Sequence, residues 1–132
     1  MAWIISYAPL TLTASNPTAQ SSPDGLATYA TSRDGANLGK SWVAASTSAS
    51  VDLAASASGT PGYVLVAGAN LSASATVSFY KGPQAGPRTL LCALSKVSGV
   101  NLWVGIPSQA VVSGTSFSID ITDATLSQIE VP

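Results

Sequence analysis

Residues 117–122 read Phe117-Ser118-Ile119-Asp120-Ile121-Thr122, and apolar and polar side chains alternate along this stretch without a break. Successive side chains of a β-strand point to opposite faces of a sheet, so the pattern separates an apolar face from a polar one. An amphipathic helix would instead repeat its apolar positions every three or four residues. The stretch therefore predicts a β-strand with one face in a hydrophobic core.

The period of two recurs elsewhere in the chain. Residues 50–53 (SVDL) and 75–80 (ATVSFY) alternate in the same way. Residues 63–67 (YVLVA) are apolar throughout, which is typical of a central strand covered on both faces. Further strands are expected at residues 3–6, 10–13, 41–45, 89–94, 101–105 and 128–131.

Turn-forming dipeptides separate these segments, among them Asn16-Pro17, Asp34-Gly35 and Gly82-Pro83. Many short strands at roughly ten-residue spacing are typical of a sandwich or barrel. We therefore expect a single all-β domain over residues 1–132, an antiparallel β-sandwich or jelly roll of roughly eight strands, in which residues 14–40 form a long, loop-rich segment. The expected core residues are Trp42, Val51, Leu53, Val64, Val66, Val77, Phe79, Ile119 and Ile121.

Charge is scarce in this chain. Charged residues make up 8% of the sequence, against about 25% in a typical soluble domain. The chain has no histidine, which is the commonest general base and the commonest metal ligand. Neither a G-x-S-x-G nor a phosphate-binding G-x-x-x-x-G-K-[ST] motif is present. The sequence thus predicts a protein that is not an enzyme and that uses no cofactor and no metal.

The charge balance and the apolar runs exclude two further kinds of partner. The net charge is −1 and the basic residues are scattered, whereas a nucleic-acid-binding domain needs a basic stripe. No apolar run approaches the roughly 20 residues of a membrane span. The apolar N-terminus has no basic region, so no signal peptide is expected. The single cysteine, Cys92, is predicted to be a buried, unpaired thiol in a reducing compartment.

Two acidic residues lie close together in the sequence, Asp120 and Asp123. Paired carboxylates can serve as an acid and a base, or can bind calcium. However, the alternation places Asp120 on the polar face of a strand and Asp123 in the turn that follows. We therefore interpret both as solvated acids.

A weak echo of the pattern G-x-N-L occurs at residues 35–38, 68–71 and 99–102. Glycine and asparagine both tolerate positive φ, so each copy is interpreted as a turn followed by an apolar residue. The alternative is a true internal repeat, although the spacings are unequal.

The middle of the chain resembles a known family. Trp42, residues 50–53, residues 63–71 (YVLVAGANL) and residues 75–80 are together similar to the galactose-binding-like (discoidin-type) jelly-roll domains. Many such domains occur in bacteriophage structural and tail-associated proteins. The resemblance covers residues 42–80 and implies a jelly-roll fold and a place in a virion. The residues that bind sugar or calcium in the binding members have no counterparts here.

Two functions remain open. The first is a virion structural protein, a bacteriophage capsid decoration (cement) protein or a head or tail accessory protein, made in the bacterial host cytoplasm. It would contact the major capsid or tail protein and copies of itself through strand edges and neutral surfaces. The residues expected at these contacts are Trp3, Ile4, Ile5, Gln128, Ile129 and Val131. The alternative is a carbohydrate-binding module on a phage tail or bacterial surface protein, with Tyr80 and Lys81 as its glycan contacts.

Overall fold

The computed structural model describes residues 12–18, 42–55, 58, 63–110 and 112–131. These residues form nine strands and no helix, which confirms the predicted all-β class. The strands are β1 (Leu12–Ser15), β2 (Trp42–Ala44), β3 (Ser48–Ala55), β4 (Val64–Ala67), β5 (Thr76–Lys81), β6 (Thr89–Lys96), β7 (Leu102–Gly105), β8 (Ser116–Thr122) and β9 (Ile129–Val131). The expected strand at residues 3–6 and most of the loop-rich segment at 14–40 lie outside the described residues.

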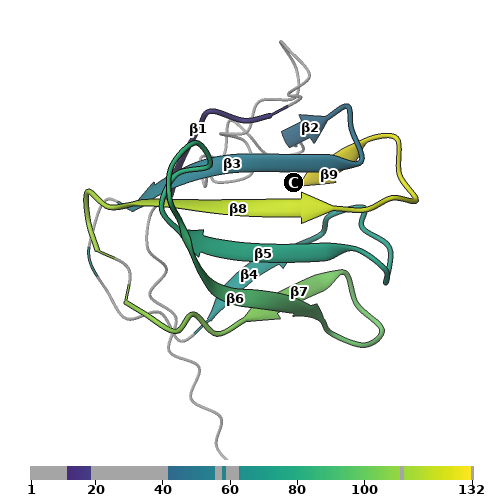
Figure 1. Cartoon of the computed structure of the whole chain (residues 1–132). Helices are drawn as coiled ribbons and strands as arrows, with labels where there is room; N and C mark the ends of the chain where they lie inside the picture. Colours follow the sequence, from purple (N-terminus) through teal and green to yellow (C-terminus); the bar gives the residue numbers. More distant parts are fainter. Residues whose placement is uncertain (1–11, 19–41, 56–57, 59–62, 111, 132) are drawn as a thin grey trace, which may run out of the picture.

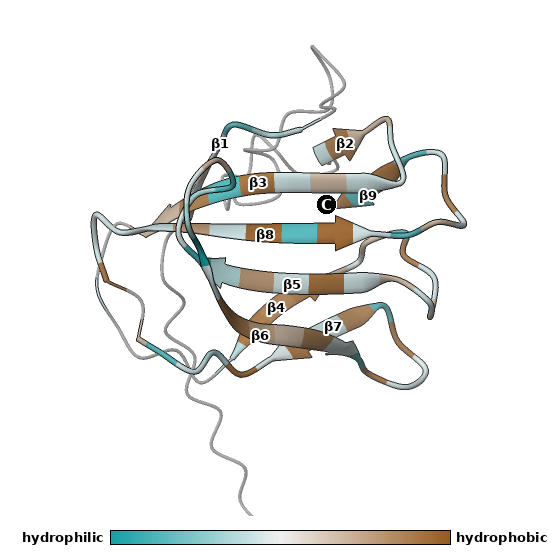
Figure 2. Cartoon of the chain, in the orientation of Figure 1, coloured by the Kyte–Doolittle hydropathy of each residue, from teal (hydrophilic) through white to brown (hydrophobic). Residues whose placement is uncertain are grey.

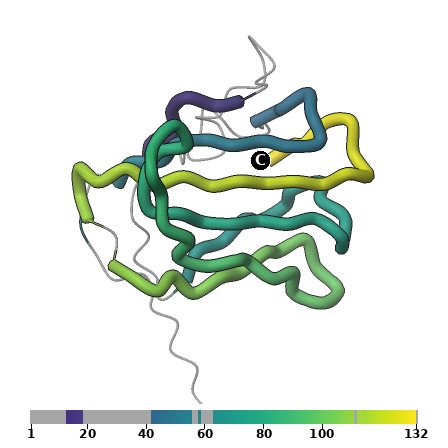
Figure 3. The backbone as a smooth tube through the Cα atoms, viewed as in Figure 1, coloured from purple at the N-terminus to yellow at the C-terminus, as the bar shows by residue number. Residues whose placement is uncertain are grey.

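The strands are arranged in two layers. Seven of them form one antiparallel sheet in the order β1-β3-β8-β5-β6-β7-β4, and β2 pairs separately with β9. The large sheet curls at β6, so that β7 and β4 lie behind β5 and β6 (Figure 1). The smooth trace in Figure 3 shows the same two layers. The predicted antiparallel sandwich is therefore correct.

Asn70 joins the two sheets at the back of the molecule. Its backbone N–H donates to the carbonyl of Glu130 over 3.2 Å, and its side-chain Oδ1 accepts from the Glu130 N–H over 2.8 Å. The loop that follows β4 therefore lies beside β9. These hydrogen bonds close the back layer where regular pairing is missing.

The core lies between the layers, on the inner faces of β3, β5 and β8. The rings of Phe79 and Phe117 stack there with their centroids 5.6 Å apart. Figure 2 shows the apolar and polar positions alternating along these strands. Of the expected core residues, Val64 is only half-buried. The other expected core residues are buried, namely Trp42, Val51, Leu53, Val66, Val77, Phe79, Ile119 and Ile121.

The interpretation of residues 63–67 as a central strand covered on both faces is wrong. β4 is the last strand of the large sheet and pairs with β7 on one side. Val66 points into the core, whereas Leu65 is 42% exposed. The apolar run does not reflect double burial. It gives the strand one buried and one exposed apolar face.

The structure confirms the turn interpretation of the second and third G-x-N-L copies. Gly68 and Gly99 both have positive φ, at 72° and 80°. The N–H of Gly68 donates to the carbonyl of Asn101 over 2.8 Å, so the two turns meet. The copy at residues 35–38 lies outside the described residues.

Candidate functional site

The front layer contains β3, β8 and β5, and its outer face carries a polar cluster. In the alternating strands β3, β8 and β5, every second side chain points away from the core. The strand register sets these side chains in rows across the three strands. One row holds Asp52, Ser118 and Tyr80, and the next holds Ser50, Asp120 and Ser78.

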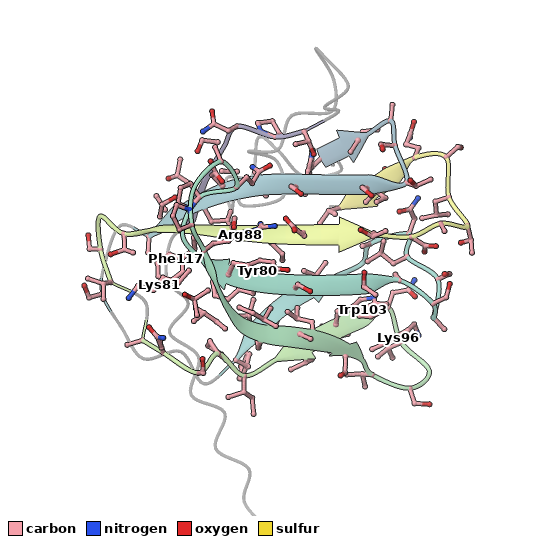
Figure 4. All side chains as sticks on the ribbon, in the orientation of Figure 1. Tyr80, Lys81, Arg88, Lys96, Trp103 and Phe117 are labelled. Atoms are coloured by element: carbon pink, nitrogen blue, oxygen red, sulfur yellow. The ribbon has the colours of Figure 1, made fainter. Side chains whose placement is uncertain are left out.

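The β5–β6 hairpin brings Arg88 onto this face. Gly82 begins the hairpin with a φ of +111°, and a Cβ there would lie 2.6 Å from the carbonyl oxygen of Pro87. Only glycine fits such a position without strain. The chain then folds back, and the guanidinium carbon of Arg88 sits 3.9 Å from the centre of the Tyr80 ring (Figure 4). At this distance the cation is attracted to the face of the ring.

Arg88 also forms a two-point ion pair with Asp120. Its Nη2 donates to Oδ2 over 2.6 Å and its Nη1 to Oδ1 over 3.0 Å. The same Nη1 donates to the hydroxyl of Ser118 over 3.2 Å. This fork fixes the plane of the guanidinium as well as its position.

The ion pair shifts the pKa of both partners. The hydrogen bond to Asp120 raises the pKa of Arg88. Burial opposes ionisation of Asp120, but its hydrogen bonds with Arg88 and Ser50 outweigh this effect and lower its pKa. Both groups therefore stay charged at neutral pH, and the cluster has the same charge across the physiological range.

Asp52 anchors the hairpin to the sheet. Its carboxylate accepts from the backbone N–H of Gln84 over 2.9 Å and from the Gln84 side-chain amide over 3.2 Å. It also accepts from the side chain of Asn16, which follows β1, over 3.0 Å. Burial would raise the pKa of Asp52, but these hydrogen bonds and the charge of Arg88 lower it. One buried carboxylate thus ties β1, β3 and the hairpin together.

The structure does not bring the two predicted glycan contacts together. Tyr80 lies on the outer face, where Arg88 covers its ring. Lys81 is the next residue of β5, so its side chain leaves the opposite face, and its Nζ lies 3.4 Å from Oε1 of Gln109. Sequence reasoning missed Arg88. The signal available was an arginine and a tyrosine on either side of a Gly-Pro hairpin.

The interpretation of Asp120 and Asp123 as solvated acids is also wrong. Asp120 is half-buried in its ion pair, and Asp123 is only 1% exposed. Asp123 accepts from the N–H of Ser72 over 2.7 Å, and from the N–H and the hydroxyl of Thr125 over 3.0 and 2.6 Å. Burial opposes its ionisation, but these hydrogen bonds outweigh it and lower its pKa to about 2. The two acids have separate structural partners.

Cys92 is less buried than predicted. It is free and half-buried in β6, and burial raises the pKa of its thiol. The neutral thiol is a poor nucleophile. Cys92 therefore serves in packing against β7.

The C-terminal strand supplies less surface than expected. The side chains of Ile129 and Val131 lie in the core, at 1% and 8% exposure. Gln128 is exposed, and its carbonyl accepts from the side chain of Asn70 over 2.9 Å. Among the three contact residues expected near the C-terminus, Gln128 is the one whose side chain is exposed to a neighbour. Trp3, Ile4 and Ile5 lie outside the described residues.

The back layer presents an exposed apolar surface instead. In the β4–β7 ladder, Leu65 pairs with Val104 and Ala67 with Leu102, and all four side chains point outward. Tyr63 and Ile106 continue the alternation at one end of the ladder, at 46% and 74% exposure. We call these six residues the β4–β7 face: Tyr63, Leu65, Ala67, Leu102, Val104 and Ile106.

No protein-family model, curated protein or solved structure matches this chain. Within the described ranges, no helix has the length and apolar character needed to cross a membrane. The same residues hold no group of three or more His, Cys, Asp or Glu side chains arranged to bind a metal ion.

Proposed function

We propose that this chain is a non-enzymatic structural protein of a bacteriophage particle, either a capsid decoration protein or an accessory protein of the head or tail. In this role it binds neighbouring subunits through neutral surfaces. The proposal is based on the exposure of the β4–β7 face. The resemblance of residues 42–80 to jelly-roll domains of phage proteins supports the assignment to a virion.

The exposure of the β4–β7 face is the first argument. Leu65 is 42% exposed on the outer side of the ladder, and Ile106, which directly follows β7, is 74% exposed. Contiguous exposed apolar patches on soluble proteins often mark interaction sites. Covering this surface with a neighbour would stabilise the assembly through the hydrophobic effect.

The distribution of charge is the second argument. The few charges on the front layer are already satisfied within the chain, since Arg88 pairs with Asp120 and Asp52 accepts three hydrogen bonds. Binding through the uncharged β4–β7 face would therefore depend on apolar contacts and neutral hydrogen bonds. Because salt screens charges, such binding changes little with ionic strength.

The proposal is tested on purified particles from the phage that encodes the chain. Quantitative mass spectrometry and labelling with a specific antibody in electron microscopy should find the chain in a fixed copy number on the head or the tail. Its retention should be unchanged between low and high salt. Particles that lack the chain, or that lose it when the salt is raised, would contradict the proposal.

A second function, glycan binding, is favoured by one observation. Arg88 is held rigidly over the Tyr80 ring on the outer face, and a planar guanidinium fixed in this way is suited to donate hydrogen bonds to sugar hydroxyls. A glycan array probed with the full chain and with Arg88→Gln tests this. Specific binding that the substitution abolishes would establish the second function, and no binding would remove it.

A further inference from the structure

We propose that the outer face of the front layer binds a neutral sugar, in which two adjacent hydroxyl oxygens accept hydrogen bonds from Arg88. Figure 4 shows Arg88 and Tyr80 on this face. The inference rests on glycan binding, the second function proposed above, and it names the class of glycan and the atoms that hold it. Two open donors, the local charge and an apolar border select this ligand.

Arg88 keeps N–H donors that no described residue uses. A guanidinium carries five N–H groups. Nη1 donates to Asp120 and Ser118, and Nη2 donates to Asp120. Among the described residues, nothing accepts from Nε–H or from the second N–H of Nη2. In that part of the chain, Trp42 Nε1 is the one buried side-chain nitrogen or oxygen without a partner, so solvent reaches the Nε of Arg88.

The geometry of these donors restricts the partner. They lie side by side on one edge of a planar group, so they fit a ligand with two neighbouring acceptor oxygens. A carboxylate has such a pair, and so do adjacent hydroxyl groups on a sugar ring. A peptide carbonyl has one oxygen and would leave a donor unpaired. Because Asp120 and the Tyr80 ring already fix the guanidinium, a ligand does not have to order it.

The local charge favours the sugar over the carboxylate. Two acids, Asp120 and Asp52, accompany the single guanidinium: Asp120 pairs with it, and its charge acts on Asp52. Both acids have lowered pKa values and are ionised at neutral pH, so this group of three has a net charge of −1. An anionic ligand would add a like charge, which is costly. A neutral pair of hydroxyl groups avoids that cost.

The strands beside Arg88 supply both polar and apolar contacts. Ser78 and Tyr80 are two residues apart on the outer side of β5, and among the described residues neither hydroxyl has a hydrogen-bond partner. Opposite them in β6 are Ala93 and Leu90, which are both exposed. A sugar ring presents C–H groups as well as hydroxyl groups. A border between hydroxyl and apolar side chains therefore suits it.

A glycan array that carries neutral oligosaccharides beside sialylated and uronic-acid glycans, probed with the full chain, tests the ligand class. We expect binding to neutral glycans with adjacent free hydroxyl groups and not to the acidic ones. The neutral glycan that binds best is then measured by isothermal titration calorimetry. Arg88→Lys keeps the charge but lacks the planar pair of donors, so it should weaken binding about tenfold or more.

Ser78→Ala should weaken binding roughly threefold or more and leave thermal melting unchanged, because no described residue bonds to this hydroxyl. Lys81→Gln is the matched control, since it removes a cation from the opposite face of β5, and it should bind like wild type. Equal binding by wild type, Arg88→Lys and Ser78→Ala would overturn the site. Binding to acidic glycans alone would overturn the ligand class and leave glycan binding standing. No binding to any glycan would remove both, while the virion proposal is decided separately on particles.

Discussion

Asp123 and Arg88 show how this chain uses its few charged residues. Each forms several hydrogen bonds within the fold: Asp123 accepts three, and Arg88 donates to Asp120 and Ser118 while covering Tyr80. Such groups are costly to disturb, because a buried polar group without its partner loses the compensation for its lost hydration. We therefore expect the charged side chains of the front layer and its loops to contribute to stability and the apolar back layer to binding.

Replacing Asp123 with asparagine should destabilise the fold by roughly 1–3 kcal/mol. The two carboxylate oxygens accept hydrogen bonds from the N–H groups of Ser72 and Thr125, and an amide has only one oxygen that can accept. Urea unfolding measures the change. Glu130→Gln is the control, because Glu130 is exposed, and its effect should stay within about 0.5 kcal/mol. Equal effects of the two substitutions would show that the Asp123 carboxylate is not needed for the turn.

Replacing Phe79 with alanine should cost about 3–5 kcal/mol, because the ring is 4% exposed and stacks on Phe117. Phe79→Leu fills most of the same space and should cost less. The free energies of unfolding of the two variants, compared with wild type, give the result. A loss below about 1 kcal/mol for the alanine variant would mean that the inner face of β5 has been assigned wrongly.

Among the elements, the strands with alternating sequences were the ones that could be predicted. β8, β5 and the centre of β3 follow their alternation, since each has one face in the core and one on the surface. β4 was assigned to the wrong place, because an apolar run does not distinguish a doubly covered strand from one that exposes an apolar face. The distinction depends on which strands lie next to it, and that is set by pairing between distant segments.

Gly105 in β7 tests how closely β6 and β7 approach each other. A Cβ at this position would lie 2.8 Å from Sγ of Cys92 and 3.1 Å from Cγ of Leu94. Gly105→Ala should therefore destabilise the fold by about 1–3 kcal/mol through overpacking. Adding Cys92→Ala removes the closest atom. The double variant should therefore lose less stability than the sum of the losses in the two single variants. Simple additivity in urea unfolding would argue against this contact.

For the molecule as a whole, the acidic groups determine how stability depends on pH. The pKa values of Asp52, Asp120 and Asp123 are all lowered in the folded state, that of Asp123 from 3.8 to about 2. A lowered pKa contributes stability that is fully present above the unfolded value and is lost as pH falls toward the folded value. The chain has no histidine, the side chain whose ordinary pKa lies between pH 5 and 8.

We therefore expect the free energy of unfolding to be flat from about pH 5 to 8 and to fall as the pH drops from about 4 toward 2. Denaturant unfolding at a series of pH values measures this profile. Asp123→Asn should reduce the steepness of the acid limb and leave the plateau flat. A marked loss of stability between pH 7 and 5 would contradict the assignment of these three carboxylates.

The candidate site was less predictable than the fold. Tyr80 was correctly placed on the outer face, but the residue that covers it, Arg88, arrives through the β5–β6 hairpin. Asp52 and Gln84 are 32 residues apart and meet only because β3 and the hairpin lie on the same side of the sheet. The β4–β7 face was not foreseen, because neither of its strands carries polar residues that would mark an outer side. Composition led to the prediction that the chain assembles through neutral surfaces, and the proposed function keeps that prediction.

The most direct test of the proposed function is the number of copies of the chain retained on the phage particle when the β4–β7 face is altered. Particles are assembled with wild type, with Leu65→Asp/Ile106→Asp, or with Leu90→Asp, and the copies per particle are counted by quantitative mass spectrometry. Leu90 is the control, because it is 52% exposed but stands opposite Tyr80, away from the β4–β7 face. The account predicts that the double variant is lost while the Leu90 variant is retained at the wild-type number. Full retention of a folded double variant would show that the exposed apolar face does not hold this protein in an assembly.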